Sequence, residues 1–301
     1  MSHHQHHHDK GEINSKNLLF AIILNFVITA AEIVGGLLSN SLALLSDALH
    51  NLSDGVAILI AYIANRISKR SSNERRTFGY KRIEILAAFF NAIILLVIII
   101  YLFYEAVLRF YNPEPIKGLI MFVVATIGLL ANLLAVFLLK KDAKINLNIR
   151  SAYLHLLGDT LSSVAVIIGG ILIYFFEIFW IDPLITILIG IYIIKETWSI
   201  LRETMEILMQ GTPHGINIKK VQDSLEALEY IENIHHLHIW SLSDQQVHFE
   251  CHIDLKEDLQ VSRTDHLLRE IERLLSERFH INHVTIQFEY NACDIKTIIN
   301  N

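Results

Sequence analysis

Residues 118–139 read GLIMFVVATIGLLANLLAVFLL, a run without a single charged side chain. A helix needs about 20 consecutive apolar residues to cross the hydrocarbon core of a bilayer, so this run is long enough to span a membrane. The composition of the whole chain agrees, because 52% of its 301 residues are hydrophobic and only 19% are charged. We therefore expect an integral protein of the lipid bilayer.

Further apolar stretches of spanning length lie on both sides of this run. They cover residues 17–38, 41–65, 85–104, 151–176 and about 178–200. The last has a short uncharged centre, Pro183 to Ile194, so its polar ends must reach the membrane interface. Together the stretches predict a six-helix transmembrane domain over residues 17–208, preceded by an arm of residues 1–16.

Basic residues gather in two of the connections between these spans. Because short connections rich in Lys and Arg stay in the cytoplasm, both of these loops, and hence both chain termini, are expected to be cytoplasmic. The first apolar stretch is too long for a signal-peptide core and lacks a cleavage site. The basic residues are Arg66, Lys69, Arg70, Arg75, Arg76, Lys81 and Arg82 in the first loop, and Lys140, Lys141, Lys144 and Arg150 in the second.

After about residue 209 the pattern becomes that of a small soluble domain, residues 209–301. Helical spacing of apolar residues predicts helices near 217–229 and 262–279, and alternation predicts strands near 235–241, 246–254 and 284–288. The order αββαβ indicates an open-faced sandwich of α+β class. Residues 210–301 hold 8 Lys and Arg against 15 Asp and Glu, and this acidic balance argues against a nucleic-acid partner.

The histidines point to the chemistry. Only two of the 16 lie in the membrane region, His50 and His155, and each is followed four residues later by an aspartate, Asp54 and Asp159. Residues four apart share one face of a helix, and the pattern recurs 105 residues later. One such pair suits an intrahelical hydrogen bond or a proton relay equally well, but the repetition favours one site built from two halves.

Two imidazoles and two carboxylates supply four ligands for a tetrahedral divalent ion. Zinc is the leading candidate, and cobalt, cadmium and ferrous iron remain open. Ionisable groups in a bilayer are costly and usually functional. Asp47 lies three residues before His50 and is a secondary candidate in the same path, the alternative being a pore-lining or solvated acid. Interhelical hydrogen bonds are expected for the lone polar residues Asn25, Glu32, Asn91, Glu105 and Asn132.

The ligand chemistry also predicts a mechanism. Zinc binds the neutral imidazole, and a histidine with a pKa of about 6.5 exchanges protons at cellular pH. Metal entry therefore displaces protons, and protonation expels the metal. We expect a transporter that exchanges a divalent metal for protons.

A second group of candidate ligands lies in the tail domain. In a regular strand His236 and His238 share one face and His235 takes the other. These histidines either form a regulatory metal site or are ordinary surface histidines on an acidic domain. Both cysteines, Cys251 and Cys293, are expected to be reduced. The candidate ligands are His235, His252, His266 and Glu289, with His236, His238 and Cys293 as possible accessories.

The first residues carry a further run of histidines, interrupted by Gln5. It is either a native arm that loosely captures metal or a purification tag. Its histidines are His3, His4, His6, His7 and His8.

Five motifs together make the chain resemble the cation diffusion facilitator family, and in particular its zinc-exporting, CzcD-like branch. They are Ser46–Asp54 (SDALHNLSD), Thr77–Ile85 (TFGYKRIEI), His155–Asp159 (HLLGD), His235–Trp240 (HHLHIW) and Val284–Glu289 (VTIQFE).

The resemblance implies that His50 and Asp54 on the second helix and His155 and Asp159 on the fifth form the transport site. Histidine in place of aspartate at the first position is associated in that family with preference for zinc over cadmium. It also implies a homodimer, in the inner membrane of a bacterium, whose metallochaperone-like tail domains bind zinc between protomers.

Within the tail domain, His235, His252 and His266 match the family's cytoplasmic zinc ligands. The chain departs from the family at His236, where aspartate is common, and at Gln287, where a final ligand is common, so the number of zinc ions there is open. The loop of residues 140–150 lacks the histidines of many animal relatives, and the N-terminal arm is a candidate replacement.

Two other classes of function compete with transport. An intramembrane metalloenzyme also uses His and Asp, but a catalytic zinc keeps an open position, whereas four protein ligands close the shell here; no His-Glu-x-x-His motif occurs either. A metal sensor would need an output domain. We therefore expect a transporter and not an enzyme.

Overall fold

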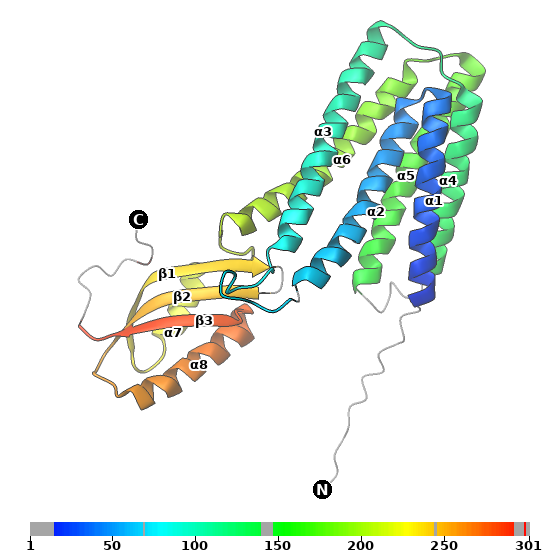
Figure 1. Ribbon diagram of the computed structural model, residues 1–301. Helices are drawn as coiled ribbons and strands as arrows, with labels where there is room; N and C mark the ends of the chain where they lie inside the picture. The colour runs from blue at the N-terminus through cyan, green and yellow to red at the C-terminus, as the bar shows by residue number, and fades with distance from the viewer. Residues whose placement is uncertain (1–14, 69, 140–146, 244–245, 292–297, 299–301) are drawn as a thin grey trace. The chain divides into compact units, whose positions relative to one another are not determined.

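The computed structural model describes residues 15–68, 70–139, 147–243, 246–291 and 298, and of residues 15–22, 58, 61, 65, 138–139 and 147–156 the backbone alone. Apolar runs become helices in a membrane because a helix satisfies its own backbone hydrogen bonds where water is absent. Each predicted span corresponds to one long helix, although the spans predicted from residues 41 and 178 begin one and three residues before their helices (Figure 1). These are α1 (Ser15–Ser39), α2 (Leu42–Ser68), α3 (Ile83–Tyr111), α4 (Gly118–Leu139), α5 (Leu147–Phe176) and α6 (Ile181–Leu208).

The helices from α2 to α6 each contain a stretch long and apolar enough to cross a bilayer, and α1 contributes the shorter apolar stretch Ile23–Ser39 within the part whose side chains are described. The expectation of a helical membrane domain is confirmed. By internal contacts the chain divides into two compact units, one made of Met1–Leu59 and Asn91–Trp198 and the other of Ile60–Phe90 and Ser199–Asn301.

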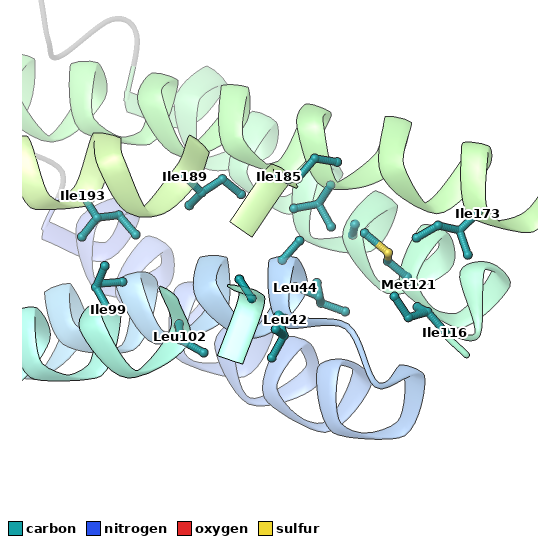
Figure 2. Close-up of a cluster of buried hydrophobic side chains, with 14 of the residues drawn as sticks. Leu42, Leu44, Ile99, Leu102, Ile116, Met121, Ile173, Ile185, Ile189 and Ile193 are labelled. Carbon is teal, nitrogen blue, oxygen red and sulfur yellow. The ribbon is translucent and has the colours of Figure 1, made fainter. Parts of the chain in front are cut away.

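The core of the first unit is built from side chains of α2 to α6, which Figure 2 shows pointing toward one another. Leu44 and Ile99 are completely buried there. Helix α4 packs against both α1 and α5, and glycine permits a close approach of α4 and α5. A Cβ on Gly170 of α5 would lie 2.9 Å from the backbone nitrogen of Phe122 on α4, nearer than real Cβ contacts allow.

The tail domain has the predicted order αββαβ. Its elements are α7 (Ile218–Glu226), β1 (Ile231–Ser243), β2 (Gln246–Leu255), α8 (Val261–Phe279) and β3 (His283–Glu289). The sheet order is β1-β2-β3, with β1 antiparallel and β3 parallel to β2. Leu225 of α7 and Ile271 of α8 are fully buried in the core that covers the sheet, so the expected α+β sandwich is confirmed.

Candidate metal sites

The membrane candidate site forms where α2 faces α5. The Nε2 atom of His50 lies 3.6 Å from Oδ2 of Asp54, one turn along α2, and 3.9 Å from Oδ1 of Asp159 on α5. His50 and Asp159 are buried, with exposed fractions of 5% and 4%. The structure thus brings three of the four predicted ligands together from two helices.

The fourth predicted ligand is His155, whose side chain lies outside the described part of the chain. Its backbone belongs to α5, like that of Asp159. Four residues along a helix correspond to about one turn, so both positions share one face of α5. The helical geometry is therefore that which the paired motifs predict.

Asp47 lies on the same helix as His50 but makes different contacts. It is 1% exposed, and its two carboxylate oxygens accept hydrogen bonds from the hydroxyls of Ser162 and Ser163 on α5, the latter at 3.2 Å. Asp47 is therefore a buried residue that links α2 to α5 by hydrogen bonds beside the site. The alternative of a solvated acid is wrong.

Of the five lone polar residues, Glu32 and Asn91 pair between helices as expected, whereas the amide nitrogen of Asn132 has no hydrogen-bond partner among the described residues. Asn51 donates to Oε2 of Glu32 on α1 at 3.2 Å, and Asn91 donates to Ser53 at 3.2 Å. Glu105 behaves differently, because it pairs with Arg109 one turn along its own helix at 3.4 Å.

The tail-domain candidate site gathers ligands from three strands. Atoms of His235, His252 and Glu289 that could bind a metal all lie within 4.8 Å of one another. His235 Nε2 is 3.3 Å from Oε2 of Glu289, and His252 Nδ1 is 2.8 Å from Oε1. His235 is completely buried. Strand pairing explains the convergence, since His235 lies opposite His252 across β1 and β2.

His236 corrects the expectation of regular alternation in β1. The register shifts between His235 and His238, and His236 has a φ of 49°, so a bulge turns its side chain toward the neighbouring strand. Its ring stacks on that of His252 with centroids 4.7 Å apart. His236 therefore joins the histidine cluster instead of sharing a face with His238, which is exposed.

The structure does not bring the remaining predicted ligands into the group of His235, His252 and Glu289 among the described residues. His266 is exposed on α8 and is not part of the described His–His–Glu group. Gln287, at the position where the resemblance implies a ligand, donates instead to Oε1 of Glu289 at 2.7 Å. Cys293 and the histidines of the N-terminal arm, His3, His4, His6, His7 and His8, lie outside the described residues.

Comparison with known proteins identifies the family. Residues 18–209 match the cation efflux transmembrane domain, and residues 213–291 match the cation efflux protein cytoplasmic domain. The chain belongs to the cation efflux family. It is 42% identical over 289 residues to a protein of Bacillus subtilis named cadmium, cobalt and zinc/H(+)-K(+) antiporter, a match that covers 95% of this chain and 92% of the relative.

Two further relatives of this cation efflux protein match at similar length. The metal cation efflux system protein CzcD of Cupriavidus metallidurans is 40% identical, over 97% of this chain and 91% of its own. The zinc transporter ZitB of Pectobacterium atrosepticum is also 40% identical, over 98% and 91%. A solved metal-bound C-terminal domain of CzcD is 31% identical over 25% of this chain and 99% of its own, with a TM-score of 0.22.

The family resemblance inferred from the motifs is thus confirmed, and the named relatives are transporters and not enzymes. Sequence reasoning missed several residues that shape this cation efflux protein's membrane domain. Asp182 accepts hydrogen bonds from the Ser41 hydroxyl at 2.5 Å and from the backbone nitrogens of Leu42 and Ala43 at 2.8 and 3.2 Å. In the sequence Asp182 is an acid at the edge of an apolar run, a pattern that indicates a flanking charge.

Proposed function

We propose that this cation efflux protein exports zinc from the cytoplasm in exchange for protons, through a site formed by His50, Asp54, His155 and Asp159. The observation that carries the proposal is the approach of His50 Nε2 to Asp54 at 3.6 Å and to Asp159 at 3.9 Å. Ligand atoms about 2.0–2.1 Å from a tetrahedral zinc are separated by about 3.3–3.4 Å. The separations in the structure are slightly longer, so a small inward movement of His50, Asp54 and Asp159 brings these three ligands to the spacing that zinc requires.

The donor set favours zinc among the divalent metals. Imidazole nitrogen and carboxylate oxygen suit zinc and cobalt, whereas softer ions prefer thiolate, and the site contains no cysteine because both thiols belong to the tail domain. The relatives are named for cadmium, cobalt and zinc and for zinc alone. Competition of cobalt and cadmium against zinc flux ranks the three.

Proton exchange follows from the same imidazole. Only the neutral form of His50 offers a lone pair to the metal, so binding and protonation exclude each other. The name of the Bacillus subtilis relative includes both H(+) and K(+) as counter-ions. With both termini in the cytoplasm, as the basic loops indicate, a proton gradient directed into the cell drives zinc outward across the inner membrane.

The tail domain, residues 209–301, is proposed to bind regulatory zinc and to join two copies of the chain into a homodimer. His235, His252 and Glu289 fit a zinc ion because their ligand atoms converge within 4.8 Å and one imidazole is buried. His266 completes the set in the proposal, as the family resemblance implies. The transmembrane domain occupies residues 17–208 and the N-terminal arm residues 1–16.

Zinc uptake into proteoliposomes under an imposed pH gradient tests the transport proposal. Asp159→Ala should lower uptake by more than about tenfold, because even groups that merely support a metal ligand are worth that much. Deletion of residues 1–10 serves as the control and should leave most of the uptake. Uptake that persists in the Asp159 variant, or that is unchanged when the gradient is collapsed, would contradict the site or the coupling respectively.

A further inference from the structure

Glu32 on α1 is a carboxylate that the divalent site leaves unexplained. It is 1% exposed inside a helix bundle of the membrane domain. Asn51 donates one hydrogen bond to Oε2 at 3.2 Å, while Oε1 is buried without a hydrogen-bond partner among the described residues. A buried carboxylate so incompletely paired is costly in the absence of a compensating charge.

Two more buried polar groups without partners among the described residues lie on α1 and on the neighbouring helix α4. They are Oγ1 of Thr29, one turn before Glu32 on α1, and Nδ2 of Asn132 on α4. Thr29 is 1% and Asn132 2% exposed. Helices α1 and α4 pack against each other, and Gly35 and Glu32 of α1 face Val124 and Gly128 of α4.

The pairing of these contacts shows that α1 and α4 run antiparallel, because the partner on α4 moves forward as the residue on α1 moves back. One further turn along α4 leads to Asn132, on the side of α4 that meets Ile28 and Glu32. Gly128 leaves the room that the Glu32 carboxylate occupies, since a Cβ there would collide with Oε1. Thr29 lies three residues before Glu32 on α1, so its unpaired hydroxyl lies on neighbouring surface of the same helix as the unpaired Oε1 of Glu32.

The charged groups around Glu32 are negative, so a cation bound there would be attracted by all of them. The charged side chains that act on it most strongly are two further carboxylates, Asp47 and Asp159. Asp47 receives two serine hydrogen bonds, and Asp159 is balanced by metal in the proposed transport site. Glu32 has one amide donor and no such balance.

We infer that Glu32, with the hydroxyl of Thr29, forms a second site that binds a monovalent cation, potassium or a proton, as counter-ion to the metal. A single carboxylate balances one positive charge, whereas a divalent ion would leave an excess charge in the bilayer interior, which is costly. Carboxylate and hydroxyl oxygens suit hard ions, and zinc prefers sites that include nitrogen or sulfur. The counter-ion role rests on the proposed transport function; the binding site does not.

The test uses the full-length chain in proteoliposomes that report zinc uptake. Uptake is measured under a potassium gradient, under a pH gradient, and with choline in place of potassium. A counter-ion coupled to zinc should change uptake by about fivefold or more. Glu32→Gln should abolish the response to one of the two gradients while zinc binding, measured by calorimetry, stays unchanged. The gradient that loses its effect identifies the ion.

Glu105→Gln is the matched control, because it makes the same chemical change at a carboxylate of α3 that pairs with Arg109. Thr29→Val keeps the shape of the side chain and removes its oxygen, so it should weaken the same response if Glu32→Gln does not fold. A Glu32→Gln protein that retains both gradient responses, or a folded Thr29→Val protein with undiminished responses, overturns the inference.

Failure of the proposed transport function is distinguishable from failure of this site. If the unaltered protein moves no zinc, thermal unfolding of the purified chain with added potassium chloride or choline chloride, and across pH, still reports binding. Stabilisation by potassium or by protons that disappears in Glu32→Gln supports the site, and equal curves for both proteins reject it.

Discussion

Replacing Asp182 with alanine should loosen the start of α2, the helix that carries His50. Asp182 lies at the beginning of α6, is completely buried, and accepts hydrogen bonds from the Ser41 hydroxyl and from the backbone nitrogens of Leu42 and Ala43. The first N–H groups of a helix have no partner within the helix. Asp182 therefore caps α2 from a position 140 residues away in the chain.

The size of the effect follows from these contacts. Hydrogen bonds to a charged acceptor contribute about 1.5–3 kcal/mol each, and losing a helix cap costs about 0.5–2 kcal/mol. Because such contributions are not additive, we expect the loss to be about 3–5 kcal/mol, the range found when one partner is removed from a buried charged pair. Even 3 kcal/mol raises the unfolded fraction about a hundredfold.

Denaturant unfolding of the purified protein in detergent measures this loss. Glu114→Gln is the control, because Glu114 is half exposed and pairs with Arg109 at 3.4 Å, a contact worth about 0–1 kcal/mol. Asp182→Asn retains one acceptor oxygen and should fall between the two. If Asp182→Ala unfolds at the same denaturant concentration as Glu114→Gln, Asp182 does not cap α2.

Three further predictions concern packing and the tail domain. Gly170→Leu should separate α4 from α5 and destabilise the membrane domain by about 1–3 kcal/mol, as overpacking does, which thermal unfolding beside Gly158→Ala checks. Burial raises the pKa of the Cys251 thiol, so alkylation by a maleimide at neutral pH should require unfolding; rapid labelling of the folded chain would contradict this. Burial, and next the neighbouring His283, lower the pKa of His248. The unfolded chain therefore binds the proton more readily, and tail-domain stability should fall as pH drops below about 6.5; His248→Phe should flatten that pH dependence.

The membrane helices were predictable because their signal is local. An uncharged run such as 118–139 has one stable conformation in a bilayer, the helix, and α4 covers those residues. The paired motifs were predictable for a similar reason, since a spacing of four residues fixes a shared helical face. The contact between His50 and Asp159 follows once α2 and α5 are neighbours, and the repeated motif indicated that they are.

The errors arose where the structure depends on distant partners or on irregular backbone. Alternation predicts that His236 faces away from His235, but the bulge at a φ of 49° reverses this, and nothing in the local pattern shows where a strand is irregular. The serines that bind Asp47 are more than 100 residues away in sequence. Serine is common in apolar helices, so the sequence offers no reason to single out these two residues.

The buried acids of the membrane domain differ in how fully protein donors satisfy them, and this difference separates their roles. Asp182 accepts three hydrogen bonds from the protein, Asp47 accepts two, and Glu32 accepts one. A carboxylate surrounded by fixed donors is already stabilised as an anion, so a cation gains little by binding it and the residue holds helices together. A carboxylate with an unpaired oxygen retains most of its attraction for a cation. Ion exchange in this bundle should therefore be confined to Glu32 and the His–Asp site, and substitutions at Asp182 should lower stability without changing which ions are exchanged.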